Sequence, residues 1–289
     1  MSFGVEAAQN DGAIAQYHAG GETMLSNLHT HTVFCDGKST PEEIVLAAID
    51  GGFASIGFSG HGYTPFDLSY CLRDTEGYLA ELDRLRSVYG KKIEIYRGLE
   101  EDATAPADRS RFDYVIGSSH YLCIRGKYHA IDSGREYFEA CLAAVGGSVT
   151  ALAETYYTAF CDYIKRRRPD IIGHFDLITK YDEQDPPRLL NDPEYRRIAL
   201  RFVAEAAAAD CLFEVNTGAM ARGLRTSPYP SEELLHYLKA CDARLILSSD
   251  SHVASTLGFA FAETERYLYD IGFRHVYALV GGEFVKRPL

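Results

Sequence analysis

Short apolar runs alternate with longer amphipathic segments along most of this chain. Runs of about four to eight apolar residues bounded by turn residues are typical of buried strands, whereas apolar positions three and four apart indicate a helix. The predicted strands are Met24–Leu28, Ala54–Ser59, Lys92–Leu99, Tyr114–Ser118, Asp170–Gly173, Cys211–Val215, Arg244–Leu247 and His275–Val280. About seven strand–helix repeats favour an α/β fold in which a parallel sheet closes into a barrel.

Helical segments lie between these strands, and the first carries clear signals at both ends. Thr40-Pro41-Glu42-Glu43 has the residues of a capping box with proline at the first helical position, and Gly51-Gly52 ends that helix. The other predicted helices are Thr75–Tyr89, Arg135–Arg167 with a break at Gly146-Gly147, Asp192–Ala209, Ser231–Cys241 and residues 254–271.

The same pattern bears on domain organisation. Residues 1–23 are rich in glycine and alanine and weakly patterned, so we expect an N-terminal extension outside the fold. Residues 24–289 contain no linker, low-complexity segment or sequence repeat. A single β/α barrel takes about 250 residues, so we expect one domain over residues 24–289.

Histidines and carboxylates stand at the ends of consecutive predicted strands. Active sites of β/α barrels lie at the carboxyl ends of the strands, so these side chains should gather on one face. Residues i and i+2 of a strand point the same way, which lets His29 and His31 reach one ion together; Asp250 and His252 share that spacing. Mixed nitrogen and oxygen donors suit zinc, manganese or iron. The candidate metal ligands are His29, His31, Asp36, His61, Glu100, His120, His174, Asp250 and His252.

Some nearby residues allow more than one interpretation. Glu101 and Asp102 compete with Glu100 as ligand, and Asp176 either caps a helix or orients His174. A lone histidine is more often a hydrogen-bonded structural residue than a ligand. The histidines interpreted as structural are His18, His236 and His275, and His129, in a predicted loop over Arg125–Ser133, is left open between substrate contact and solvation.

Charge and composition narrow the classes of function. The chain has 29 lysines and arginines against 41 acidic residues, a net charge of −12, which argues against a nucleic-acid partner but not against a small phosphorylated one. No run approaches the roughly 18 apolar residues of a membrane helix, so no membrane partner is expected. The seven cysteines contain no CxxC pair, and we expect a cytoplasmic protein. The oligomeric state is left open.

The motifs resemble those of the PHP family, named for polymerase and histidinol phosphatase. The resemblance lies in His29-Thr30-His31-Thr32, Ser59-Gly60-His61, Gly98-Leu99-Glu100, Gly117-Ser118-Ser119-His120, Gly173-His174-Phe175-Asp176 and Ser249-Asp250-Ser251-His252. It implies a distorted (β/α)7 barrel of the PHP type that holds two to three divalent metal ions. The implied sites are His29, His31, Glu100 and Asp250 for the first ion, Glu100, His120 and His174 for the second, and His61, His252 and Asp36 for the third.

Within this family the chain is most similar to the stand-alone histidinol-phosphate phosphatases. That branch implies hydrolysis of L-histidinol phosphate to L-histidinol and phosphate, in histidine biosynthesis. Asp250, His252 or a metal-bound water would protonate the leaving group. Arg222, Arg225 and Lys180 are candidates for phosphate or substrate contact, with solvated loop charges as the alternative. We expect Arg222→Ala to weaken substrate binding and to leave metal content unchanged.

Three other functions remain as alternatives. Another PHP-family phosphoesterase, a phosphodiesterase or a nuclease acting on nucleotides, would use the same ligands, although the acidic balance counts against the nuclease. Metal-dependent amidohydrolases also begin with an HxH strand, but they usually carry a ligand lysine on a middle strand, and none stands at the matching position here. A non-catalytic metal-binding module should have lost ligands, and this set is complete apart from Asp36, near which some relatives in the family have histidine instead.

Overall fold

The computed structural model describes residues 24–184 and 188–289. The predicted extension, residues 1–23, lies outside the described residues, as does His18. The interpretation of residues 24–289 as one domain stays a prediction.

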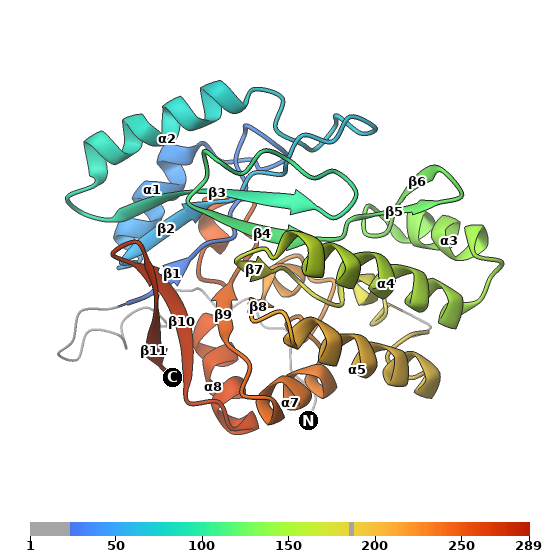
Figure 1. Ribbon diagram of the computed structural model, residues 1–289. Coiled ribbons are helices and arrows are strands. Elements are labelled where there is room, and N and C mark those ends of the chain that lie inside the picture. The colour runs from blue at the N-terminus through green and yellow to red at the C-terminus, as the bar shows by residue number, and fades with distance from the viewer. Residues whose placement is uncertain (1–23, 185–187) are drawn as a thin grey trace.

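A curled sheet forms the centre of the molecule (Figure 1). In the described residues it contains nine strands in the order β1-β2-β3-β4-β7-β8-β9-β10-β11, and only the last pair is antiparallel. The strands are β1 Ser26–Asn27, β2 Ser55–Phe58, β3 Glu94–Asp102, β4 Tyr114–Ser118, β7 Ile171–Ile172, β8 Leu212–Asn216, β9 Leu245–Ser248, β10 His275–Val280 and β11 Glu283–Pro288.

The sheet closes between the segments that follow β1 and β9. Thr30 and Ser251 form a parallel bridge there. The His31 amide donates to the Ser251 carbonyl at 2.8 Å, and the Ser251 amide donates to the His29 carbonyl at 3.1 Å. The seven parallel strands from β1 to β9 therefore form a distorted barrel, which confirms the predicted fold class.

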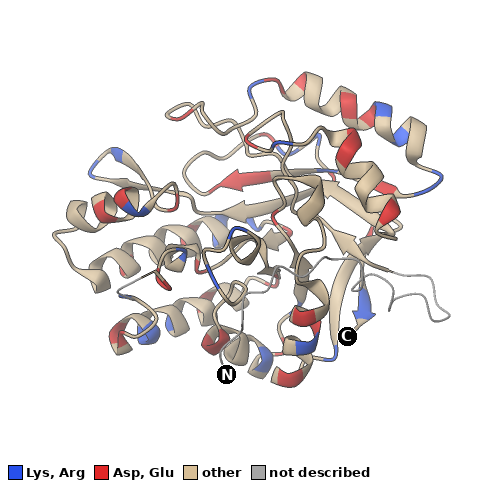
Figure 2. Ribbon diagram, turned by 180° about the vertical axis from the view of Figure 1, so that it is seen from behind, with Lys and Arg blue, Asp and Glu red and all other residues tan. Residues whose placement is uncertain are grey.

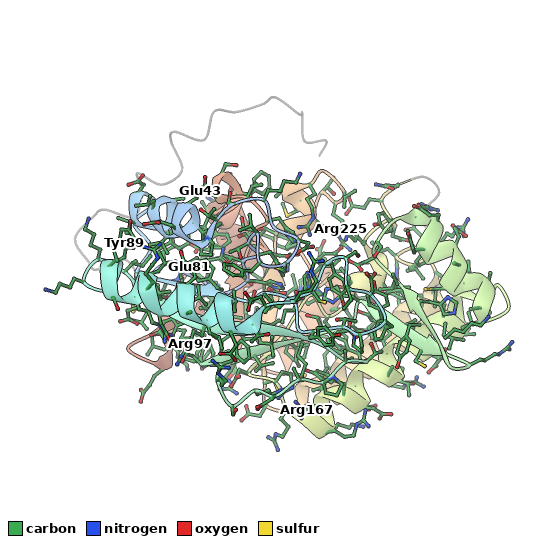
Figure 3. The ribbon with its side chains drawn as sticks, turned by 90° about the horizontal axis from the view of Figure 1, so that it is seen from above. Glu43, Glu81, Tyr89, Arg97, Arg167 and Arg225 are labelled. Carbon is green, nitrogen blue, oxygen red and sulfur yellow. The ribbon has the colours of Figure 1, made fainter. Side chains whose placement is uncertain are left out.

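Helices cover the outside of this barrel (Figure 1). The predicted capping box is present, because Thr40 Oγ1 accepts from the Glu43 amide and the Glu43 carboxylate accepts from the Thr40 amide. Beside α1 lies α2, which carries Tyr89 (Figure 3), and the Tyr89 hydroxyl donates to the Glu42 carboxylate of α1 at 2.6 Å. The helices are α1 Pro41–Asp50, α2 Thr75–Tyr89, α3 Arg135–Ala144, α4 Val149–Arg167, α5 Pro193–Ala207, α6 Gly218–Ala221, α7 Glu232–Ala240 and α8 Phe261–Ile271.

Charged residues are distributed unevenly over the barrel. Acidic and basic residues lie mainly on the outer helices and loops, whereas the end of β3 is acidic (Figure 2). Glu100, Glu101 and Asp102 form that end, and all three are buried. None of the helices in the two described ranges is long and apolar enough to cross a lipid bilayer.

Two predictions about elements were wrong, and one strand was missed. The predicted loop Arg125–Ser133 contains half of an antiparallel hairpin formed by β5 Tyr121–Ile124 and β6 Lys127–Ala130. Its turn places Arg125 and Gly126 at positive φ, and Arg-Gly is not one of the residue pairs that signal such a turn. Strand β11 was not predicted, and α8 begins at Phe261 rather than near residue 254, where a 3₁₀ turn stands instead.

Candidate metal centre

All nine predicted ligands meet at the carboxyl end of the barrel. They form four overlapping groups, and within each group the candidate ligand atoms lie within 4.8 Å of one another. The groups are His31, Asp36, His61 and His252; His29, Glu100 and His174; His29, His31 and Asp250; and His61, Glu100 and His120.

Glu100 lies at the centre of the cluster, and only 1% of it is exposed. Its Oε2 atom lies 2.9 Å from His61 Nδ1 and 3.2 Å from His29 Nε2. Its Oε1 atom lies 3.0 Å from His174 Nε2 and 3.3 Å from His120 Nε2. A carboxylate whose two oxygens face different imidazoles is suited to bridge two cations.

The two acidic neighbours of Glu100 have other partners. Strand β3 continues through Asp102, so successive side chains point to opposite faces. Glu101 faces Arg109 and Arg167 on the outer side of the barrel. Asp102 accepts a hydrogen bond from the His120 amide at 2.7 Å, so it supports the backbone of a candidate ligand. This geometry favours Glu100 as the ligand.

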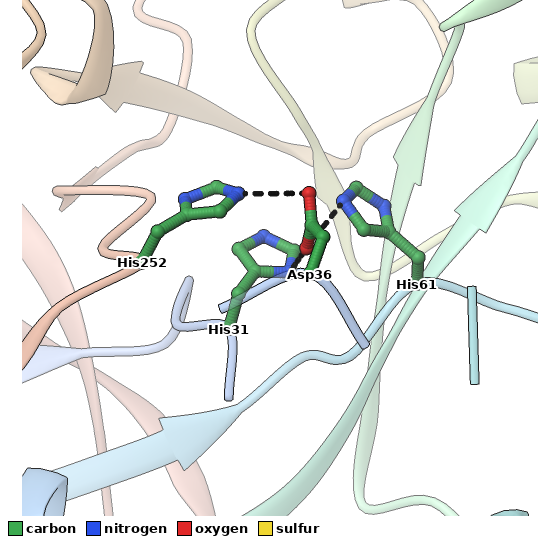
Figure 4. A group of neighbouring side chains, drawn as sticks. All are labelled: His31, Asp36, His61 and His252. Carbon is green, nitrogen blue, oxygen red and sulfur yellow. Dashed lines mark hydrogen bonds and ion pairs between the residues drawn. The ribbon is translucent and has the colours of Figure 1, made fainter. Parts of the chain in front are cut away.

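Asp36 comes from the loop between β1 and α1 and faces three histidines (Figure 4). Its carboxylate oxygens lie 3.2 Å from His252 Nε2, 3.5 Å from His61 Nε2 and 3.7 Å from His31 Nδ1. The next residue, Gly37, allows this approach, because a Cβ atom there would lie 2.4 Å from the His31 carbonyl carbon. The loop therefore brings Asp36 to the cluster despite its irregular backbone.

Asp250 follows β9 in a strained backbone conformation. Its φ is +47°, a region that residues other than glycine rarely adopt and that is common at functional sites. Asp250 Oδ1 lies 3.2 Å from His31 Nε2 and 3.6 Å from His29 Nε2. Arg222 holds the other side of this residue, with Nη2 donating to Oδ2 at 2.9 Å and Nη1 donating to the carbonyl at 3.2 Å.

Glu214, for which no role was predicted from the sequence, supports the cluster from behind. It is fully buried in β8, and its carboxylate lies 2.5 Å from His29 Nδ1 and accepts from the His174 amide at 2.7 Å. A carboxylate on Nδ1 orients the ring and leaves Nε2 for a metal. The sequence did contain a signal for this role: Glu214 and Asn216 are two residues apart and place two polar side chains on one face of an apolar strand.

Burial and the neighbouring carboxylates act in opposite directions on the pKa values of His29 and His61. Burial disfavours charged His29, but Glu214 and Glu100 raise its pKa well above its usual value. Burial also disfavours charged His61, but Glu100 is among the carboxylates that raise its pKa to about 9. Burial and the neighbouring imidazoles lower the pKa of His31 to about 3. The buried carboxylates thus attract positive charge, which divalent cations can supply.

The residues present fit such cations. Among the residues that the structure describes, His29 Nε2, His31 Nε2 and Glu100 Oε2 are buried atoms without a hydrogen-bond partner. Buried polar atoms are rarely left without a partner, so these three atoms call for an ion or a water molecule. Imidazole nitrogens with carboxylate oxygens are typical ligands of zinc, manganese and iron. We conclude that this is a metal site built from histidine, aspartate and glutamate.

The cluster opens on a cavity of about 370 Å³. Two of the three predicted substrate contacts, Arg222 and Lys180, line it. Lys180 Nζ donates to the carboxylate and the carbonyl of Asp132, each at 2.9 Å. Arg225, labelled in Figure 3, lies outside the residues that line this cavity. It is buried, donates to Thr179, and packs over the Tyr229 ring.

The residues left open in the prediction, Asp176 and His129, and the described histidines interpreted as structural lie apart from the predicted ligand set. Asp176 Oδ2 accepts from the Ser231 amide at 2.9 Å, and its side chain does not cap the helical turn that follows it. His236 is exposed on α7 and lies 3.7 Å from Glu232. His275 begins β10, and His129 lies in β6.

The sequence of this chain is similar to those of known proteins. The PHP domain model matches residues 27–218. The protein named probable histidinol-phosphatase of Schizosaccharomyces pombe is 29% identical, over 86% of this chain and 87% of that protein. The histidinol-phosphatase of Bacillus subtilis is 26% identical, over 81% and 95%.

A solved structure shows the same fold. The crystal structure of histidinol phosphate phosphatase from Lactococcus lactis, complexed with zinc, L-histidinol and phosphate, has a TM-score of 0.70 at 22% identity, and the alignment covers 91% of this chain and 99% of that one. The family model covers more than half of the chain. The chain therefore belongs to the PHP domain family.

Proposed function

We propose that this protein is a metal-dependent phosphomonoesterase that hydrolyses L-histidinol phosphate to L-histidinol and phosphate. One observation carries the proposal: eight candidate histidine and aspartate ligands surround the buried carboxylate of Glu100, and the cluster opens on a cavity of about 370 Å³ that Arg222 and Lys180 also line. Cation ligands beside positively charged side chains suit a small phosphorylated substrate.

In this proposal the cluster would hold two to three divalent ions of zinc, manganese or iron. His29, His31, Glu100 and Asp250 would hold the first, Glu100, His120 and His174 the second, and His61, His252 and Asp36 the third. When bound, such ions neutralise charge on phosphoryl oxygens and lower the pKa of water. The position of Glu100 between His29 and His174 supports its assignment as a shared ligand.

The side chains around the cluster have separate tasks in this proposal. Arg222 reaches the cavity beside Asp250 and can donate to phosphate oxygens. Lys180 and Asp132 place opposite charges on the same wall, which complements a substrate with a phosphate and an ammonium group. Asp250 and His252 line the cavity and are the candidates that protonate the leaving alkoxide. Arg225 is left out, because it does not line the cavity.

The relatives support the choice of substrate. Two proteins that match most of this chain are named for histidinol phosphatase activity. The structure from Lactococcus lactis was solved with zinc, L-histidinol and phosphate. Histidine biosynthesis is the pathway that consumes this ester, and we place the protein there.

Release of inorganic phosphate from L-histidinol phosphate tests the proposal. The metal content of the purified protein is measured first, and an aryl phosphate, a phosphodiester and single-stranded DNA serve as competing substrates. We expect strong preference for L-histidinol phosphate and loss of both metal and activity in His29→Ala. Preference for the phosphodiester or for DNA would overturn the choice of substrate. Full metal content without turnover of any of these compounds would favour a non-catalytic metal-binding module.

A further inference from the structure

A second recess lies beside the metal cavity. Its volume is about 440 Å³, and Tyr121 and Ser133 line both spaces. The recess is built from the β5–β6 hairpin, the start of α3 and the loop before α2, with Phe66, Asp67, Tyr128, His129 and Tyr137 among its lining residues. The proposed function gives it no role.

Aromatic rings dominate the walls of this recess. Phe66 stacks on Tyr128 with ring centroids 3.7 Å apart and nearly parallel planes. Phe66 also meets Tyr121 edge to face at 5.0 Å, which fixes the rings relative to the wall of the metal cavity. Tyr128 and Tyr137 are nonetheless 46% and 47% exposed. Aromatic surface left open to water beside an active site is typical of a ligand subsite.

A fixed carboxylate stands among these rings. Asp67 accepts from the Ser69 amide at 2.9 Å, from the Ser69 hydroxyl at 2.6 Å, and from the Tyr121 hydroxyl. Burial disfavours the charged form of Asp67, but these hydrogen bonds lower its pKa below the usual value. The recess therefore presents flat apolar faces and a negative charge, and His129 adds a further polar group.

We propose that this recess binds the imidazole ring of the substrate and of the dephosphorylated product. A planar ring packs against aromatic faces, and the ring N–H, or the imidazolium form, finds the carboxylate of Asp67. The phosphate then lies at the metal cluster, and the short carbon chain passes along Tyr121, the wall that the two spaces share. This inference rests on the proposed function and identifies its specificity residues, Phe66, Asp67 and Tyr128.

The test compares L-histidinol phosphate with O-phosphoethanolamine, which keeps the phosphate and the ammonium group but lacks the imidazole. In Phe66→Leu and in Asp67→Asn we expect the ratio of kcat/KM for the two esters to fall about tenfold, since a lost aromatic or charged contact has an effect of that order. Tyr269→Leu, which changes a similarly exposed tyrosine on α8, should keep the wild-type ratio. Circular dichroism verifies that each variant is folded.

An unchanged ratio in Phe66→Leu and Asp67→Asn, with a wild type that prefers L-histidinol phosphate, would overturn the subsite and leave the proposed function intact. A wild type that hydrolyses neither ester would overturn the proposed function, and titration calorimetry with L-histidinol then decides on the recess. Binding that weakens in both variants would support the subsite. Absence of binding to the wild type would overturn it.

Discussion

Arg222 connects the substrate cavity to the metal cluster. Its guanidinium lines the cavity and also donates to the side chain and to the carbonyl of Asp250, whose backbone has a strained conformation. Because Asp250 is a proposed ligand, Arg222 holds it in place as well as facing the substrate. This double contact changes the expectation drawn from the sequence, where Arg222→Ala was predicted to leave metal content unchanged.

We now expect Arg222→Ala to weaken both metal retention and catalysis. Loss of a residue that orients a metal ligand typically lowers metal affinity about 10- to 100-fold, and loss of a charged hydrogen bond lowers kcat/KM by about tenfold or more. Metal analysis after dialysis against a weak chelator, together with phosphate release, measures both effects. Arg266→Ala, an exposed arginine on α8, is the control. Full metal retention with impaired kinetics would restore the earlier expectation.

The sequence predicted the positions of the candidate ligands better than the positions of the residues that support them. His29 and His31, or Asp250 and His252, are two residues apart at strand ends, so spacing alone places them on one face. The role of Glu214 depends on which residue of another strand lies beside it, and spacing within one strand does not contain that information. Arg225 was predicted to contact the substrate because it follows a strand end near the predicted site. Its side chain instead points inward and donates to Thr179.

At the scale of elements, Glu101 joins β3 to α4 and to the loop after β3. It is fully buried, and its carboxylate accepts hydrogen bonds from Arg109, Arg167 and Tyr163 and from the Ala107 amide. Burial alone would raise the pKa of Glu101, but these partners lower it to about 2. Glu100 directly precedes Glu101 in β3. The ion pairs of Glu101 with Arg109 and Arg167 therefore fix the strand that carries the central carboxylate of the site.

We expect Glu101→Gln to lower the free energy of unfolding by about 1.5 to 3 kcal/mol at neutral pH, because Arg109 and Arg167 lose their charged acceptor but are partly exposed and keep other acceptors. A carboxylate with a depressed pKa stabilises the folded state above its unfolded-state value of 4.5, and that stabilisation is lost as pH falls toward about 2. Urea unfolding between pH 2 and 7 measures this: the wild type should lose more stability than the variant below pH 4.5. Parallel pH profiles would contradict the assignment.

The sequence predicted the barrel strands more reliably than the strands outside the barrel. Strands such as Leu245–Ser248 are buried throughout, so they read as continuous apolar runs between turn signals. Strand β11 and the hairpin strand β6 have mostly exposed or partly exposed residues. Their polar sequences resemble those of loops, and their pairing with β10 and β5 depends on turn geometry rather than on burial.

At the scale of the whole molecule, barrel closure and the metal site share the same residues. The bridge that closes the barrel joins Thr30 to Ser251. Thr30 lies between His29 and His31, and Ser251 between Asp250 and His252. Cations bound by these neighbouring residues would therefore hold the two segments together where the sheet closes. Without cations, the buried carboxylates would repel one another.

Removal of the metals should accordingly loosen the closure of the barrel more than its other parts. A ligand that binds only the folded state adds about 2.7 kcal/mol of stability when its free concentration is 100 times the dissociation constant, so chelation should lower Tm by several degrees and added metal should restore it. Hydrogen exchange locates the effect. The amides of His31 and Ser251, which pair across the closure, should exchange faster after chelation, while amides in the middle of α5 serve as the control. Equal acceleration in α5 would mean that the metals stabilise the whole fold rather than its closure, and an unchanged Tm would mean that no metal ion was bound by the folded protein.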